Sequence, residues 1–220
     1  MAIPNAQVEK KGLDDKIKQI FHEHQGGQAL DVRQLVLLCE ELELVSWSSG
    51  PNAMDAAYYA LFLAGLLTLR ELNRAKHLWR RLPEKDKNGL PEIWAVGQAL
   101  WKREVSQAYV AIAAAEALPL NVEIKAVLGE LKKSIGLYNA SLLGRAYASV
   151  PTAVVAQALG LSLDDTLKFC ASRQWRVQGD LVFPTKEVSA NGPSTEAELE
   201  QLRQLSSYIL HLEQRSVLKI

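Results

Sequence analysis

The sequence predicts a mainly α protein, in which a solenoid-like bundle of helical repeats leads into a winged-helix module and then one C-terminal helix. Three observations predict it. Apolar residues recur at helical spacing through most of the chain. Ser149–Lys186 has the order of a winged helix: a short extended segment, two helices joined by a tight turn, and a β-hairpin. A turn-rich segment then separates this module from a final amphipathic stretch.

The first residues predict one short amphipathic helix, because Leu13, Ile17, Ile20 and Phe21 fall at helical spacing. We expect this extension to be loosely attached and partly flexible. Its His22-Glu23-His24 invites a metal interpretation. The downstream acidic ligand of a zinc isopeptidase is missing, so we interpret both histidines as solvated and predict no metal site.

Five helices should follow. They are expected at Asp31–Val45, Met54–Leu69, Asn73–Leu82, Pro91–Arg103 and Val105–Leu118. Met54–Leu69 is apolar nearly all round, which predicts a central position among the helices. We interpret Trp79, Trp94 and Trp101 as packing between neighbouring helices rather than as a ligand box.

A long helix should begin after the cap residue Asn121 and reach about Ala148. Its apolar residues keep a regular 4-3 spacing that predicts one buried face throughout. They are Ile124, Leu128, Leu131, Ile135, Tyr138 and Leu142. Gly129, Gly136 and Gly144 interrupt it, either to admit a neighbouring helix closely or to kink the helix.

The predicted winged helix carries clear boundary signals. Thr152 should cap the helix Ala153–Leu159, and Gly160 should end it in the left-handed conformation. Ser162 with Asp165 predicts a capping box for the next helix.

That second helix should span Leu163–Gln174 with Leu163, Leu167 and Cys170 facing inward. Trp175–Gln178 and Leu181–Pro184 should be strands joined at Gly179-Asp180.

Charge decides between two uses of this module. Ser149–Glu187 holds equal numbers of basic and acidic residues. They are Lys168, Arg173, Arg176 and Lys186 against Asp164, Asp165, Asp180 and Glu187. DNA readers neutralise several phosphates, so a nucleic-acid-binding winged helix is the weaker alternative. An exposed sheet edge that adds a strand from a neighbour is the stronger one.

The tail supplies a second surface. Thr195 and Glu198 predict a capping box for a helix reaching about Gln214, with apolar residues at coiled-coil spacing. The predicted protein-interaction residues are therefore Trp175, Val177, Leu181, Val182 and Phe183 of the wing and Leu199, Leu202, Leu205, Ile209 and Leu212 of the tail.

Composition excludes several other functions. The 220 residues are 48% apolar and 23% charged with no net charge, which argues against nucleic acid or an anionic membrane as a partner. No phosphate loop, nucleophile elbow or Cys/His cluster is present, so we expect no enzyme, no catalytic residue and no cofactor.

We interpret Cys39 and Cys170 as buried thiols, with a disulfide or a reactive thiol as the alternative. The N-terminus lacks the apolar core of a signal peptide and Ala56–Leu69 is too short to span a membrane, so we expect a cytoplasmic and nuclear protein.

Helical repeats, a winged helix and a tail helix together resemble the PCI-domain family of the proteasome lid, the signalosome and initiation factor three. Within it, the blocks Arg74–Pro83, Ile93–Trp101, Arg145–Val150 and Leu202–Glu213 are similar to the family of signalosome subunit 8. Gly160-Leu161 and Gln174-Trp175 fit the same pattern. The sister families are the proteasome lid non-ATPase subunit 8 and initiation factor three subunit k.

The resemblance implies a non-catalytic subunit of the complex that removes NEDD8 from cullins and so regulates cullin–RING ubiquitin ligases. It implies winged helices joined edge to edge in an arc, with subunit 3 as the neighbour, and tail helices gathered in one bundle. We divide the chain accordingly. The N-terminal extension is 1–27, the helical repeats 28–148, the winged helix 149–188, the linker 189–194 and the C-terminal assembly helix 195–220.

Overall fold

The computed structural model describes residues 4–48, 55–82, 89–185 and 202–209. The chain divides into two compact units, Met1–Thr185 and Lys186–Ile220, and each is described by itself. The predicted linker and the capping box of Thr195 and Glu198 lie outside the described residues.

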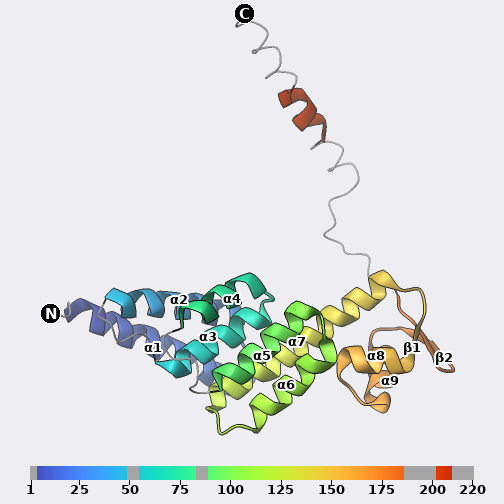
Figure 1. Cartoon of the computed structure of the whole chain (residues 1–220), viewed down its shortest axis with the longest axis horizontal. Coiled ribbons are helices and arrows are strands. Elements are labelled where there is room, and N and C mark those ends of the chain that lie inside the picture. Colours follow the sequence, from blue (N-terminus) through green and yellow to red (C-terminus); the bar gives the residue numbers. More distant parts are fainter. Residues whose placement is uncertain (1–3, 49–54, 83–88, 186–201, 210–220) are drawn as a thin grey trace, which may run out of the picture. The chain divides into compact units, whose positions relative to one another are not determined.

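Helices that pack side by side form the first part of the larger unit (Figure 1). They are α1 (Pro4–Gln25), α2 (Val32–Ser48), α3 (Ala56–Thr68), α4 (Leu72–Arg81), α5 (Leu90–Lys102) and α6 (Val105–Ala117). Helices adjacent in sequence are adjacent in space, since α1 packs on α2, α2 on α3, and α5 on α6. The mainly α fold class predicted from the sequence is confirmed.

Helix α3 occupies the centre, as its composition predicts. It contacts α2, α4, α5 and α7. All of its described side chains from Tyr59 to Leu67 are buried, which a helix with apolar residues on every side requires. Asp55 caps its N-terminus by accepting a hydrogen bond from the backbone N–H of Ala57.

Helix α1 is not loosely attached, so that expectation is wrong. Leu13, Ile17, Ile20 and Phe21 are each buried and belong to the same hydrophobic core as α2 and α3. Four large apolar side chains on one face bind the helix to α2 more firmly than a short polar segment suggests.

Helix α7 (Val122–Ala146) passes from the helical repeats into the winged helix (Figure 1). Its first half buries Ile124, Leu128, Leu131 and Ile135, as predicted. Tyr138 and Leu142 are each 43% exposed, so the predicted stripe fails in the second half.

The buried face of α7 turns because its neighbour changes. α7 packs first on α3 and then on α8. The buried residues of the second half are Asn139, Ala140, Leu143 and Gly144.

The winged helix has its own small core around a three-stranded sheet. Its elements are β1 (Val150–Pro151), α8 (Thr152–Leu159), α9 (Leu163–Ser172), β2 (Arg176–Gln178) and β3 (Leu181–Phe183). The strands are antiparallel in the order β1-β3-β2, with Val182 of β3 opposite Val150 and Val177. Val182 is completely buried, while Leu181 is 42% exposed, so successive residues of β3 face the core and the surface in turn.

Two boundary predictions for this module are confirmed and one is wrong. Gly160 ends α8 with φ 64°, and the Ser162 hydroxyl caps α9 by accepting from the N–H of Asp165. Thr152 lies inside α8 instead of capping it, because its hydroxyl donates to the Asp180 carbonyl at 3.0 Å. That bond ties α8 to the turn between β2 and β3.

The inward face of α9 was also predicted wrongly in part. Leu163 and Leu167 are 58% and 44% exposed, whereas Thr166 and Cys170 are fully buried. Thr166 can be buried because its hydroxyl donates to the carbonyl of Ser162 at 2.7 Å.

Of the three tryptophans predicted to pack between helices, two do so and the third is exposed, and the glycines of α7 are not required for close packing. Trp79 and Trp94 stack with their ring centroids 5.4 Å apart, which confirms helix packing for this pair. Trp101 is 49% exposed beneath the Lys76 ammonium. A Cβ on Gly136 or Gly144 would make only ordinary contacts and one on Gly129 none, so close packing does not require these glycines.

Candidate protein-docking surfaces

The wing residues predicted to contact a partner separate into a buried pair and a more accessible set. Trp175 is 6% exposed and Val182 is fully buried, whereas Val177 and Phe183 are half-buried and Leu181 is exposed. The Trp175 ring meets the ring of Phe169 edge-on at 6.0 Å. The side chains of Trp175 and Val182 therefore support the wing from within and do not face a partner.

Strand β2 is the better edge for adding a strand from another chain. β3 lies between β1 and β2, so each outer strand is an edge of the sheet in the part of the chain that the structure describes. β1 has two residues and includes Pro151, which lacks a backbone N–H. β2 offers Arg176, Val177 and Gln178 instead.

The described cations of the winged helix are engaged within the module, and Lys186 lies outside the described residues. The Lys168 ammonium lies 3.1 Å from the Asp165 carboxylate, and Arg176 lies over the ring of Phe183. Arg173 lies over the ring of Phe169. A hydrogen bond from Ser162, followed by Lys168, lowers the pKa of Asp165, which keeps a negative charge at the start of α9. Such a face is poorly suited to DNA phosphates.

The tail shows the predicted apolar residues within its described part. Residues 202–209 are helical, and Leu202, Leu205 and Ile209 are 60%, 60% and 55% exposed. Sequence reasoning missed Tyr208, which is 72% exposed beside them. Leu199 and Leu212 lie outside the described residues.

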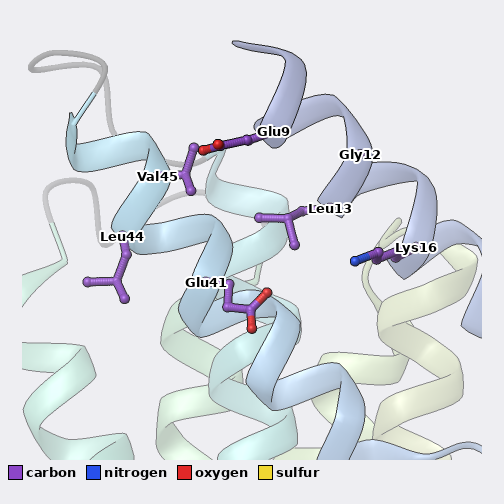
Figure 2. A pocket seen from close by; sticks show the side chains of 7 residues that line it. All are labelled: Glu9, Gly12, Leu13, Lys16, Glu41, Leu44 and Val45. Atoms are coloured by element: carbon purple, nitrogen blue, oxygen red, sulfur yellow. The ribbon is translucent and has the colours of Figure 1, made fainter. Parts of the chain in front are cut away.

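A groove between α1 and α2 was not predicted. Figure 2 shows Leu13 and Val45 pointing toward the space between the two helices, with Glu9, Lys16 and Glu41 around it. The groove measures about 450 Å³. Leu44, at 72% exposure, lies at its border, and Trp47 on the same helix is 59% exposed. The sequence signal for this groove is Leu44, an apolar residue on the exposed side of α2.

No metal-binding cluster of three or more His, Cys, Asp or Glu residues occurs within the described ranges. His22 and His24 are not placed inward: His22 is exposed, and His24 Nδ1 lies 2.9 Å from the Gln28 carbonyl oxygen.

Burial raises the pKa of the Cys39 thiol to about 12 and raises that of Cys170 as well, so neither forms a thiolate readily. Both thiols are free. No described helix is both long enough and apolar enough to cross a membrane.

Comparisons with known proteins agree with this architecture. The model of the CSN8/PSMD8/EIF3K family matches residues 53–193. COP9 signalosome complex subunit 8 of Danio rerio is 30% identical over 185 residues, which cover 82% of this chain and 93% of the relative. The same subunit of Arabidopsis thaliana is 26% identical over 179 residues, 80% of this chain and 89% of the relative. That of Xenopus tropicalis is 30% identical over 182 residues, 80% and 90% of the two chains.

Proposed function

Because this chain belongs to the CSN8/PSMD8/EIF3K family, we propose that it is a non-catalytic scaffold subunit of a COP9 signalosome. The relatives named above carry that complex in their names and align over nearly their whole length. The complex would remove NEDD8 from cullins and so regulate cullin–RING ubiquitin ligases, in the cytoplasm and the nucleus. The isopeptidase would reside in another subunit.

The observation that carries this proposal is a neutral winged helix with an accessible edge strand. A partner strand added to β2 would pair with backbone groups of Arg176–Gln178, and the rest of that partner would cover Leu181 and Phe183 on the face of β3. The neighbour in such an arc would be a PCI subunit, with subunit 3 as the proposed one.

The tail would provide the second attachment. Burying each large aliphatic side chain contributes roughly 1.5–3 kcal/mol, so Leu202, Leu205 and Ile209 favour insertion into a helical bundle. An isolated helix of this kind is marginally stable in water, which makes a partner bundle its natural environment.

Variants of the tail test the proposal. A chain carrying Leu205→Glu and Ile209→Glu should lose most of its co-purification with the complex from cells. Ser206→Glu with Ser207→Glu adds the same charge to the same helix off the stripe and should co-purify normally. Undiminished incorporation of the Leu205/Ile209 variant would remove the tail from the proposal.

The wing is tested by Leu181→Glu, with Val154→Glu on α8 as the control because Val154 is similarly exposed at 46%. We expect only the first to weaken incorporation.

The subunits that co-elute with the unmodified chain distinguish the signalosome from the proteasome lid and from initiation factor three. Zinc-dependent cleavage of a NEDD8–cullin conjugate by the isolated chain would contradict the non-catalytic role.

A further inference from the structure

A second groove opens between α7 and the turn that joins α8 to α9. It measures about 370 Å³, within the range of ligand-binding clefts. Its lining is almost wholly apolar apart from two lysine side chains. The lining residues are Lys132, Lys133, Gly136, Leu137, Leu159, Leu161 and Phe169.

The walls of this groove are held in place by packing behind them. Leu159 and Leu161 flank Gly160, whose left-handed conformation makes the tight turn. The ring of Tyr109 fills the space behind Gly160, since a Cβ added there would lie 2.7 Å from the ring. Phe169 is fixed edge-on against the ring of Trp175. The groove is therefore a preformed feature.

The floor is buried, but the sides are accessible. Leu159 is 4% exposed, while Leu137 and Leu161 are 51% and 38% exposed. An apolar side chain entering the groove would cover both leucines, and this burial would favour binding.

The charges at the groove have one sign. Among the residues that the structure describes, Lys132 and Lys133 are the charged ones of the lining, and none supplies a carboxylate. Lys133 pairs with Glu130 at 2.7 Å, but its side chain is 69% exposed. An exposed pair of this kind contributes little free energy and is readily exchanged for another carboxylate.

We propose that this groove binds a short segment of a partner protein in which a large apolar side chain is flanked by acidic residues. The apolar residue would contact Leu137, Leu159 and Phe169, and the acidic residues would pair with Lys132 and Lys133. The described residues that line the groove come from α7, α8, α9 and the turn between α8 and α9, and none of them belongs to β2, so the inference does not depend on docking at the edge of the sheet.

The test uses the full chain and fluorescein-labelled synthetic peptides, measured by fluorescence polarisation. One peptide has Leu and Phe anchors flanked by Glu and Asp. A second has the same anchors flanked by Lys, and a third has the acidic flanks with Ala in place of the anchors. We expect the first to bind at least about tenfold more tightly than the others, and added salt to weaken it.

Matched variants locate the site. Leu137→Glu should weaken binding about tenfold or more, while Val110→Glu, at the 64% exposed Val110 of α6, should leave it unchanged. Lys132→Glu with Lys133→Glu should weaken binding of the acidic peptide and strengthen binding of the lysine-flanked peptide. Lys10→Glu with Lys11→Glu, another consecutive pair on α1, should do neither.

Each variant is first checked for a native circular dichroism spectrum and melting temperature, so that a loss of peptide binding cannot come from unfolding. Equal affinity for acidic and basic peptides would overturn the proposal, as would binding that Leu137→Glu leaves unchanged, or no binding at all. Light scattering that shows a dimer dissociated by Leu137→Glu would assign the groove to a second copy of this chain instead.

Discussion

The side-chain amide of Asn139 donates a hydrogen bond of 2.9 Å to the backbone carbonyl of Ala158. Asn139 is 7% exposed in the second half of α7, and Ala158 lies in the last turn of α8, where carbonyls lack partners within the helix. The Tyr109 hydroxyl of α6 donates to the same carbonyl at 3.4 Å. One oxygen therefore joins the helical repeats to the winged helix.

Asn139→Ala should lower the free energy of unfolding. The substitution leaves the Ala158 carbonyl with only the long bond from Tyr109, and an unsatisfied buried polar group costs about 1–3 kcal/mol. Urea unfolding followed by circular dichroism measures the change. Ser141→Ala, at a half-buried position of the same helix, is the control. Equal stability of the two variants would show that the Asn139 bond contributes nothing.

Tyr109 should make the protein sensitive to alkaline pH. Burial raises the pKa of its phenol from the ordinary 10.0 to about 12. The folded state then retains the proton longer than the unfolded state does, so this group favours folding fully below pH 10 and loses that contribution as pH rises toward 12.

The check is the melting temperature of the wild type and of Tyr109→Phe across that alkaline range. We expect the wild type to lose more stability than the phenylalanine variant as the pH rises. Parallel curves would mean that Tyr109 ionises equally in the folded and unfolded states.

Three glycine substitutions separate backbone strain from crowding. Gly160→Ala should be the most damaging, because φ is 64° and the new Cβ would meet the Tyr109 ring at 2.7 Å. Left-handed strain costs about 1–2 kcal/mol, and overpacking adds about 1–3 kcal/mol.

Gly179→Ala has a positive φ of 60° but nothing within 4 Å, so it should show the strain alone. Gly129→Ala lies within α7 with open space around it and should stabilise the protein by about 1 kcal/mol. Urea unfolding ranks the three variants. A Gly160→Ala variant no weaker than Gly179→Ala would contradict the packing of Tyr109 behind the turn.

Local signals in the sequence predict where the helices and strands lie, but they do not always predict which side of a helix is buried. Ser162 and Gly160 marked boundaries correctly, because a cap bond and a left-handed turn depend on neighbouring residues only. Tyr138 and Leu142 were assigned to the core because periodicity assumes one neighbour along the whole helix. The packing partner of α7 changes from α3 to α8, and this tertiary change cannot be predicted from the residue spacing within α7.

The same limit applies to the docking surfaces. Leu181 is accessible as a docking residue must be, whereas Trp175 and Val182, which are predicted to contact a partner as well, are core residues. The groove at Leu137 and Leu161 could not be predicted, because its residues come from α7, α8, the intervening turn and α9. Whether the wing and tail residues contact partners stays a prediction.

Glu43 and Arg81 form an ion pair that joins α2 to α4 and should matter more than most surface pairs. Arg81 Nε donates to the Glu43 carboxylate at 2.9 Å, and a second guanidinium nitrogen donates to its other oxygen. The Glu43 side chain is 9% exposed, while that of Arg81 is 49% exposed. Arg81→Leu would therefore leave a buried carboxylate without this partner, at a cost of about 1–3 kcal/mol.

The double variant Glu43→Leu/Arg81→Leu should recover most of that loss, since replacing both members of a buried pair by apolar residues is often nearly neutral. Arg80→Leu, at the exposed neighbouring position, should change little. Urea unfolding of the three variants closes the comparison. If Arg81→Leu were as stable as the wild type, water would be solvating Glu43 well enough to make the pair dispensable. If the double variant were no better than the single one, the loss would come from the packing of the Arg81 side chain, and the buried charge would not be its cause.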